Sequence, residues 1–274
     1  MTGSEQNHVA PRLLRNRKEG LMFQNAIVRK PSNQYAKGIT TSDLGAPDIK
    51  LALEQHKRYV SALEKCGVKV TVLDGNNRFP DSTFVEDQAV IVQDLAVITR
   101  PGNLSRRGET TLIAPVLEEF FKKIEHISAP GTLDGGDIME VGSTLFIGLS
   151  DRTNAEGANQ LKSIVEREGY RVFLIPVGQG LHLKTFMGVV GENDIVVLDK
   201  FKDRPEFAGV NRFVISPEDT YACNCRRVND HVILPAGFPA VSSMLTENGF
   251  SVLEVELSEF QKMDGGVSCL SLLF

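Results

Sequence analysis

The residue types that this chain uses sparingly exclude several classes of protein. It has no tryptophan, four cysteines and five histidines among 274 residues. Four irregularly spaced cysteines are too few for a disulfide framework, so we expect a reducing, cytoplasmic location where a thiol can be kept for chemistry. The longest apolar runs, such as 195–198 and 270–274, are far shorter than the ~20 residues of a transmembrane helix. Residues 1–20 also lack the apolar core of a secretory signal.

Positive charge is not in excess either. The formal net charge is −5 and the isoelectric point is near 5.6. A chain of this charge has no basic field for nucleic acid or an anionic membrane surface, so we expect neither as a partner. The 42% of hydrophobic and 24% of charged residues are ordinary for a soluble globular protein, which excludes fibres and disordered chains.

The first twenty residues differ from the rest of the chain. They carry several basic side chains without a clear period, and Glu5 and Glu19 interrupt the pattern that a basic targeting helix would show. We predict a poorly ordered tail at 1–20 and a single domain at 21–274. A domain of that length buries roughly three quarters of its unfolded surface.

A polar segment that leads into a strand pattern occurs five times, at intervals of about 40 to 50 residues. Four of these units predict β-hairpins, and the fifth has a single strand at 267–274. A strand predicted at 23–29 would supply its partner, so that the two ends of the chain pair and close a ring. The predicted hairpins span 89–99, 138–147, 186–198 and 226–234, and the predicted amphipathic helices span 48–66, 111–123, 154–168 and 238–248.

This pattern predicts a five-bladed α/β propeller of pseudo-fivefold repeats, closed by pairing of the N- and C-terminal strands. A doubly wound parallel sheet is the alternative. Its sequence signature is single buried strands alternating with helices, whereas this chain has hairpins.

In such a ring, the start of each hairpin points toward a common centre. Carboxylates that converge there repel one another and are stabilised by a bound cation. The chain lacks His-x₃-His and paired Cys-x₂-Cys spacings, which argues against a metal, whereas a guanidinium can donate to carboxylates in bidentate fashion. The residues expected at the centre are Asp81, Glu86, Asp87, Asp134, Asp137, His182, Lys184, Asn224, Asp264 and Cys269.

Cys269 and His182 are the candidates for chemistry. Cys269 follows two glycines and, on a strand, would lie on the face opposite the leucines. A reactive thiol and a small buried hydrophobe fit that position equally well. His182 is a catalyst only if the fold brings it to Cys269, and otherwise a structural histidine. His56 is predicted on a helix surface.

For the other candidates, a structural role competes with a functional one. Cys223 and Cys225 could form half of a metal site, but with no matching pair elsewhere we favour structural packing. Arg100 and Arg152 each follow the second strand of a hairpin. They could clamp a carboxylate or be solvated surface residues.

Seven segments, in order along the chain, resemble the dimethylarginine dimethylaminohydrolase family. They are FPDSTFVED at 79–87, ITRPG at 98–102, SRR at 105–107, LDGGD at 133–137, RTN at 152–154, LHLK at 181–184 and MDGGVSC at 263–269. The resemblance runs from about residue 23 to the end. The wider group of guanidino-group-modifying enzymes has the five-bladed α/β propeller (pentein) fold of ββαβ repeats.

The resemblance implies roles for individual residues. Cys269 corresponds to the nucleophile, His182 to the general acid and base, and Asp134 to the carboxylate that orients the histidine, a position where some relatives have Glu. The residues implied to bind substrate are Asp81, Glu86 and Asp87 at the guanidinium end, Arg100 and Arg152 at the carboxylate end, Ile39 in a lid loop, and Met263 and Asp264.

The implied reaction is hydrolysis of methylated arginine to citrulline through a covalent S-alkylthiouronium on Cys269. No cofactor and no metal are expected, and the expected partner is a small guanidino amino acid; a homodimer is left open. Citrulline ureidohydrolase and arginine deiminase activities would use the same residues, and agmatine is disfavoured because it has no carboxylate for the arginines. A non-catalytic methylarginine-binding protein and a structural metalloprotein are more distant alternatives.

Overall fold

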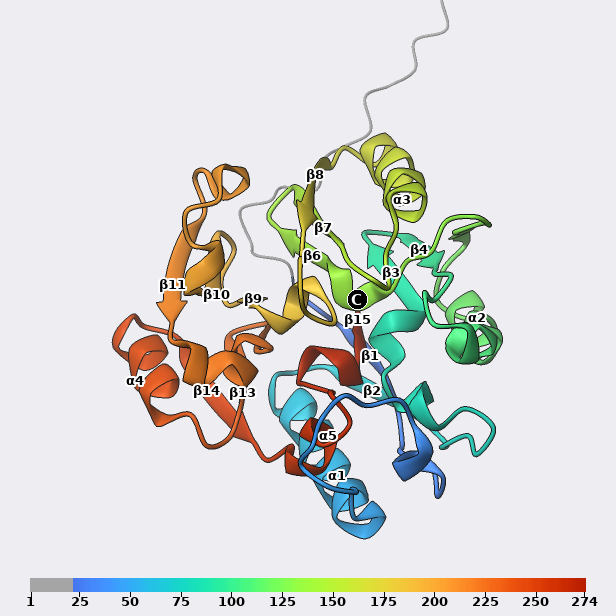
Figure 1. The fold of residues 1–274 in the computed structure, drawn as a ribbon, viewed down its shortest axis with the longest axis horizontal. Coiled ribbons are helices and arrows are strands. Elements are labelled where there is room, and N and C mark those ends of the chain that lie inside the picture. Colours follow the sequence, from blue (N-terminus) through green and yellow to red (C-terminus); the bar gives the residue numbers. More distant parts are fainter. Residues whose placement is uncertain (1–21) are drawn as a thin grey trace, which may run out of the picture.

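The computed structural model describes residues 22–274, so the tail predicted at 1–20 lies outside the described residues. The described chain has an α/β fold with five three-stranded sheets (Figure 1). In each sheet the central strand is antiparallel to one neighbour and parallel to the other. In sheet order the strands are β15 (Leu272–Leu273), β1 (Asn25–Arg29) and β2 (Lys69–Leu73); β3 (Ala89–Val92), β4 (Leu95–Ile98) and β5 (Lys123–His126); β6 (Ile138–Val141), β7 (Thr144–Leu149) and β8 (Arg171–Pro176); β9 (Met187–Val189), β10 (Asp194–Leu198) and β11 (Asn211–Ile215); and β12 (Arg226–Val228), β13 (His231–Pro235) and β14 (Ser251–Val255).

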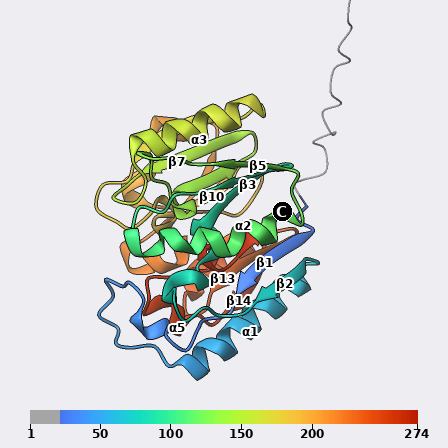
Figure 2. The same cartoon turned by 90° about the vertical axis from the view of Figure 1, so that its right-hand side faces the viewer.

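Helices connect the central strand to its parallel neighbour in four of the sheets, as a parallel pair requires a crossover. Figures 1 and 2 show these helices on the outside of the molecule. They are α1 (Ile49–Lys65), α2 (Thr110–Glu118), α3 (Ala155–Arg167) and α4 (Pro239–Glu247), and the short α5 (Ser258–Gln261) follows β14.

Short 3₁₀ turns lie between the strands and helices, and four of them stand where the chain enters a hairpin, namely η3 (Val85–Gln88), η5 (Gly135–Asp137), η6 (Leu183–Thr185) and η9 (Pro217–Cys223). They place polar residues at the strand starts, and the candidate residues lie on or beside several of them. The other turns are η1 (Tyr35–Lys37), η2 (Pro80–Thr83), η4 (Leu104–Glu109), η7 (Asp199–Phe201), η8 (Pro205–Phe207) and η10 (Ser268–Leu270).

Helix α1 shows why the local sequence folds as it does. The side chain of Asp48 caps its N-terminus by accepting from the backbone N–H groups of Lys50 and Leu51. The helix ends before Gly67, whose φ of +82° is a conformation that glycine adopts without strain. One stripe of the helix, which includes Tyr59 and Leu63, is fully buried.

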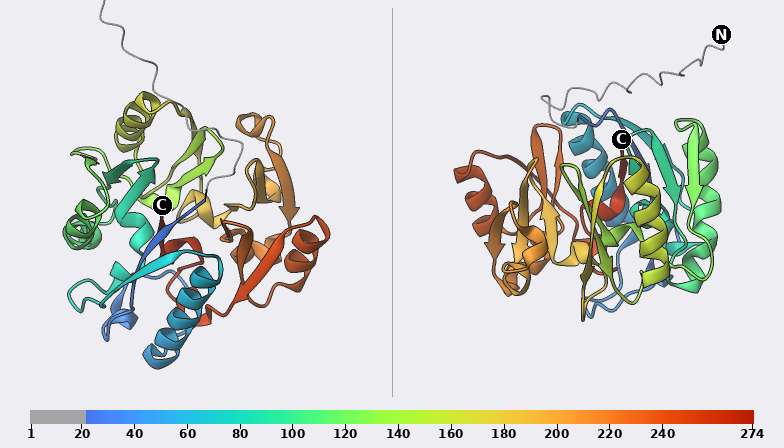
Figure 3. Two further views of the ribbon diagram at one scale, coloured as in Figure 1. Left: turned by 180° about the vertical axis from the view of Figure 1, so that it is seen from behind. Right: turned by 90° about the horizontal axis from the view of Figure 1, so that it is seen from above.

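The two ends of the described chain pair with each other. β1 and β15 are antiparallel, with Ala26 opposite Leu273 and Ile27 opposite Leu272. The carbonyl oxygen of Phe274 also accepts from the N–H groups of Gln24 and Asn25. Figure 3 shows the C-terminus beside β1. The predicted pairing of the terminal strands is therefore confirmed.

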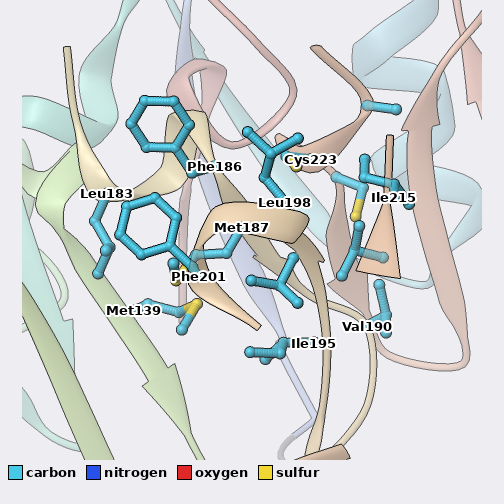
Figure 4. Close-up of a cluster of buried hydrophobic side chains, with 14 of the residues drawn as sticks. Met139, Leu183, Phe186, Met187, Val190, Ile195, Leu198, Phe201, Ile215 and Cys223 are labelled. Carbon is cyan, nitrogen blue, oxygen red and sulfur yellow. The ribbon is translucent and has the colours of Figure 1, made fainter. Parts of the chain in front are cut away.

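The hydrophobic core lies between neighbouring sheets. Figure 4 shows the largest cluster, in which side chains from η6, β9 and β10 pack against Met139 of β6 and Cys223 of η9. The four cysteines are all free thiols, and Cys66, Cys223 and Cys225 are buried. No helix within residues 22–274 combines the length and the hydrophobicity needed to cross a bilayer.

Three sequence predictions about local structure are wrong. The helix predicted at 111–123 ends at Glu118, and Lys123 is already the first residue of strand β5. The strand predicted at 267–274 is reduced to β15, because residues 268–270 form the turn η10 that carries Cys269. His56 is buried rather than on the surface, with 2% of its area exposed. Burial lowers the pKa of His56 to about 4.

Candidate active site

Most of the predicted site residues line one hollow that opens to solvent. Its lining contains a thiol, an imidazole, carboxylates and guanidinium groups, contributed by turns that are far apart in the sequence. The predicted residues that line it are Ile39, Asp81, Asp87, Arg152, His182, Met263, Asp264 and Cys269. Asp134, Glu86 and Arg100 do not belong to the lining.

The turn η10 presents the half-buried thiol of Cys269 to this hollow. Burial, together with the nearby negative charges of Glu86 and Asp87, raises the pKa of Cys269 to about 12. Without a bound cation, the thiol is therefore protonated at neutral pH.

His182 lies in the same hollow, immediately before η6. Its Nε2 is 3.1 Å from Oδ2 of Asp134 and 3.9 Å from Oδ1 of Asp87. Burial acts to lower the pKa of His182, but the charge of Asp87, the hydrogen bond with Asp134 and the charge of Asp137 raise it to about 9. The imidazole is therefore a cation at neutral pH.

The backbone beside His182 has to be glycine. A Cβ atom on Gly136 would lie 2.7 Å from Nδ1 of the imidazole ring. The Asp-Gly-Gly-Asp segment can therefore approach the histidine closely. Its first carboxylate, Asp134, contacts the imidazole, and Oδ1 of its second, Asp137, accepts from the N–H of Leu183.

Asp134 is completely buried behind His182. Its Oδ1 accepts from the backbone N–H of Gly102 at 2.9 Å, so that Oδ2 is left for the imidazole. Such a carboxylate fixes the orientation of the ring and stabilises its charged form. The structure places Asp134 where the sequence analysis expected a partner of His182.

Asp87 is held as an anion at the bottom of the hollow. It accepts from Nη1 of Arg106 at 2.6 Å and from the N–H of Gly136 at 2.9 Å. Burial acts to raise the pKa of Asp87, but the neighbouring charges of His182 and Arg106 lower it to about 2. Asp87 is thus ionised over the whole physiological range.

Arg106 is a lining residue that the sequence analysis missed as a candidate. Its buried guanidinium donates to Asp87 and to Glu109. Burial raises the pKa of Glu109 to about 7. The signal was present in the Ser-Arg-Arg segment at 105–107, shortly after Arg100, but spacing alone did not show which arginine turns inward.

Arg100 is not brought to the hollow. Its Nη1 donates to the carbonyl oxygen of Gly131 at 3.0 Å, and its backbone bridges to Leu133. The interpretation of Arg100 as a carboxylate clamp therefore lacks support from its position, and the two arginines that line the hollow are Arg106 and Arg152.

Glu86 is also placed differently from the expectation. Its carboxylate accepts from Lys184 and Arg226 through Oε1 and from the hydroxyl of Ser268 through Oε2. Glu86 itself does not line the hollow, and its carboxylate is engaged by groups of the protein.

The loop that precedes α1 contributes to the lining of the hollow, and it donates hydrogen bonds to two carboxylates. The N–H of Ile39 donates to Oδ1 of Asp81 at 2.9 Å, and the N–H and hydroxyl of Thr41 donate to Oδ2 of Asp264. Asp264 has a φ of +58°, which a non-glycine residue adopts only where its surroundings hold it. Burial raises the pKa of Asp81.

Within residues 22–274, one group of side chains could hold a metal ion. Asp87, Asp134 and His182 offer ligand atoms within 4.8 Å of one another. These atoms already contact Arg106, Gly136 and Gly102 as well as each other. The combination of anions and guanidinium groups in the lining matches a small molecule that carries both charges.

A comparison with family models and known proteins gives a consistent result. The model described as "N,N dimethylarginine dimethylhydrolase, eukaryotic" matches residues 22–213. The N(G),N(G)-dimethylarginine dimethylaminohydrolase of Pseudomonas aeruginosa is 45% identical over 254 residues, which cover 92% of this chain and all of that protein. The protein of the same name from Streptomyces coelicolor is 35% identical over 250 residues, which cover 91% and 96%.

Solved structures agree with these sequence matches. A cysteine-to-serine mutant of the Pseudomonas aeruginosa protein complexed with citrulline superimposes with a TM-score of 0.91 over 93% of this chain and all of that one, at 45% identity. The N-terminal domain of a cyanobacterial arginine dihydrolase has a TM-score of 0.81 over 91% of this chain and 96% of that one. At 20% identity, that second match shows the fold alone.

Proposed function

This chain belongs to the dimethylarginine dimethylaminohydrolase family, and we propose that it hydrolyses Nω-methylated arginine to citrulline and dimethylamine or methylamine. As a hydrolase of C–N bonds, it needs a strong nucleophile and an acid for the departing amine, because a guanidinium carbon is a poor electrophile. The observation that carries the proposal is that Cys269 and His182 line one hollow together with Asp81 and Asp87.

The charges of the lining suggest how the substrate binds. The guanidinium would lie against Asp81 and Asp87, since carboxylates accept its fixed donors. The α-carboxylate would contact Arg152, with Arg106 as a further positive group in the lining. The loop at Ile39 and Thr41 would cover the bound molecule.

The first half of the reaction starts with ionisation of Cys269. The positive substrate beside the sulfur favours the thiolate, and the thiol proton passes to solvent. The thiolate attacks the guanidinium carbon, and a tetrahedral adduct forms. His182, a cation at neutral pH, donates its proton to the leaving nitrogen as the C–N bond breaks. Dimethylamine or methylamine departs, and an S-alkylthiouronium remains on Cys269.

The second half uses the same imidazole as a base. Neutral His182 takes a proton from water, and the resulting hydroxide attacks the thiouronium carbon. The C–S bond breaks, the thiolate leaves and the hydroxyl proton is lost as the ureido carbonyl of citrulline forms. Asp134 keeps the imidazole oriented through both halves.

Membership of this family also suggests that the five sheets form a propeller. The five sheets and their shared strand order support five blades of a propeller, of the pentein kind, which the β1–β15 pair closes. In this arrangement residues 21–274 form a single catalytic domain, and each of the five blades contributes residues to the hollow or to the contacts beneath it.

The test is a substrate panel of asymmetric dimethylarginine, monomethylarginine, arginine, agmatine and citrulline, with products identified by mass spectrometry. We expect citrulline from the two methylated substrates and a covalent adduct of the intact wild-type protein during turnover. Cys269→Ser should abolish turnover and adduct while it still binds substrate. Release of ammonia from arginine alone would instead identify a deiminase, and binding without any product would identify a methylarginine-binding protein.

A further inference from the structure

Glu86 is the most heavily engaged carboxylate beneath the hollow. With 4% of its area exposed, it accepts from Lys184 Nζ at 2.5 Å, from Arg226 Nη1 at 3.1 Å and from Ser268 Oγ at 2.7 Å. Both carboxylate oxygens are therefore occupied by groups of the protein. Charge-assisted hydrogen bonds of this kind are strong, and losing one partner leaves a buried charge unsatisfied.

Two of the three partners of Glu86 are sequence neighbours of the proposed catalytic residues. Ser268 directly precedes Cys269, and Lys184 is two residues after His182. Lys184 Nζ also donates to the carbonyl oxygen of Gly135, the residue after Asp134, at 3.2 Å. One ion pair thus connects the three segments that carry the nucleophile, the imidazole and its carboxylate.

Asn224 closes these contacts into a ring. Its Nδ2 donates to the carbonyl oxygen of Lys184 at 3.2 Å, and its Oδ1 accepts from the N–H of Ser268 at 2.8 Å. Ser268 is held through both its hydroxyl and its backbone, by Glu86 and Asn224. The turn that presents the thiol therefore has little freedom relative to the histidine segment.

We propose that Glu86, with Lys184 as its counter-ion, is a positioning residue that fixes the Cys269 turn against the His182 and Asp134 segments. It acts through Ser268 and Lys184. The inference rests on the proposed function, because positioning matters for catalysis only if these three residues carry it. A misplacement of about 1 Å in reacting groups can cost roughly 100-fold in rate, which is the size of effect such a network can have.

Ser268→Ala tests the link with the smallest structural change. We expect kcat to fall about 10- to 100-fold and KM to change less than about 3-fold, because binding groups are untouched. Ser242→Ala is the matched control: it removes a hydroxyl that also donates to a carboxylate at 2.7 Å, on the surface at Glu254. Its kinetics should equal those of the wild type.

Glu86→Gln and the double variant test whether Ser268 acts through Glu86. The double variant combines Glu86→Gln with Ser268→Ala. Its kcat should be no more than about 3-fold below that of Glu86→Gln alone, since both changes break one network. Lys184→Met should lower kcat like Glu86→Gln, and Lys184→Arg, which keeps the charge, should restore part of it. A tenfold rise in KM at unchanged kcat in Glu86→Gln would instead make Glu86 a substrate ligand and overturn the inference.

Hydrogen exchange separates this inference from the proposed function, because it needs no substrate. In Ser268→Ala, amides of residues 265–271 should exchange about tenfold faster than in the wild type and in Ser242→Ala. Unchanged exchange together with unchanged kcat would overturn the positioning role. A wild-type protein that releases no citrulline but shows the faster exchange would contradict the proposed function and leave the structural link standing.

Discussion

At the scale of single residues, the protonation states of Cys269 and His182 set the conditions for catalysis. Attack requires the thiolate and the imidazolium together, yet burial and carboxylates raise the pKa of Cys269 to about 12 and carboxylates raise that of His182 to about 9. Only a small fraction of the free protein holds both forms at neutral pH. The positive charge of the substrate has to supply the remaining stabilisation of the thiolate.

These two values predict the pH dependence of kcat/KM, which reports on the free protein. Below about pH 9 the imidazolium is fully formed while the thiolate increases, so kcat/KM should rise about tenfold per pH unit. Above pH 9 the loss of imidazolium cancels the gain in thiolate, and the profile should level off. Initial rates at low methylarginine concentration from pH 6 to 10 measure this. A decline that begins below pH 8 would contradict the assignment of His182 as the acid.

Arg152 offers a test of the carboxylate end of the hollow. We expect Arg152→Ala to raise the Kd for methylarginine about 10- to 100-fold, because a guanidinium–carboxylate contact of about 1.5–3 kcal/mol is lost. The affinity should be measured by calorimetry in a Cys269→Ser background to avoid turnover. Arg100→Ala is the matched control, because the side chain of Arg100 donates to Gly131 instead. This variant should bind methylarginine nearly as tightly as the Cys269→Ser protein without it. Equal affinities in both variants would refute the clamp.

Residue types predicted the chemistry well, but not the direction of every side chain. Cys269, His182 and Asp87 come together as the sequence led us to expect. Arg100 and Arg106 are both basic residues just after β4, and only the folded path of 100–107 decides which one faces inward. Helical periodicity likewise cannot show that Phe260 packs beside His56 and covers it.

At the scale of elements, glycines allow helices and turns to approach backbone closely. In α3, a Cβ atom on Gly157 would overlap the carbonyl group of Thr132. Gly157→Ala should therefore destabilise the protein by about 2 kcal/mol, although the same change in an exposed helix stabilises by up to about 1 kcal/mol. Urea unfolding measures the difference. Ser163→Ala, exposed on the same helix, should change stability by less than about 0.5 kcal/mol. A stabilising effect of Gly157→Ala would show that the helix can move away.

Elements with a strong local signal were predictable, and others were not. The hairpins β3–β4, β6–β7 and β12–β13 and the helix α1 have buried apolar faces and clear turns, and they lie where the sequence predicted. The third strand of the second sheet, β5, is largely exposed and has a single apolar residue, Ile124. Its strand conformation comes from pairing with the central strand, which a local pattern does not encode.

At the scale of the whole molecule, β15 holds the first sheet together from the far end of the chain. Deletion of residues 272–274 would remove the buried Leu272 and Leu273, the pairing with β1 and the contacts of the Phe274 ring with Phe120 and Phe121. Burial of two leucines contributes about 4 kcal/mol. The unfolding midpoint should therefore fall by about 8 to 16 °C.

Differential scanning calorimetry of the deletion variant checks this expectation. Phe274→Leu is the matched control, since it keeps every backbone hydrogen bond of β15 and alters only the ring contacts. The unfolding midpoint of Phe274→Leu should fall by less than half as much as that of the deletion variant. A deletion variant as stable as the wild type would show that the pairing of β1 with β15 does not stabilise the fold.

The global arrangement was predictable because the units repeat. Four predicted hairpins and one unpaired strand at each end leave few ways to satisfy all strand edges, and pairing of the ends satisfies them. The distances across the hollow were not predictable, because they depend on how the sheets pack, which involves side chains from several units at once.

Phe274 lies close to Gln24 and Asn25. We therefore expect that the sheets can assemble even when their order along the sequence is changed. A circularly permuted gene could join residue 274 to residue 22 by a short linker and open new termini at the exposed 208–209 loop between β10 and β11. Such a rearranged polypeptide would place the thiol in the first half of the sequence and still build the same hollow.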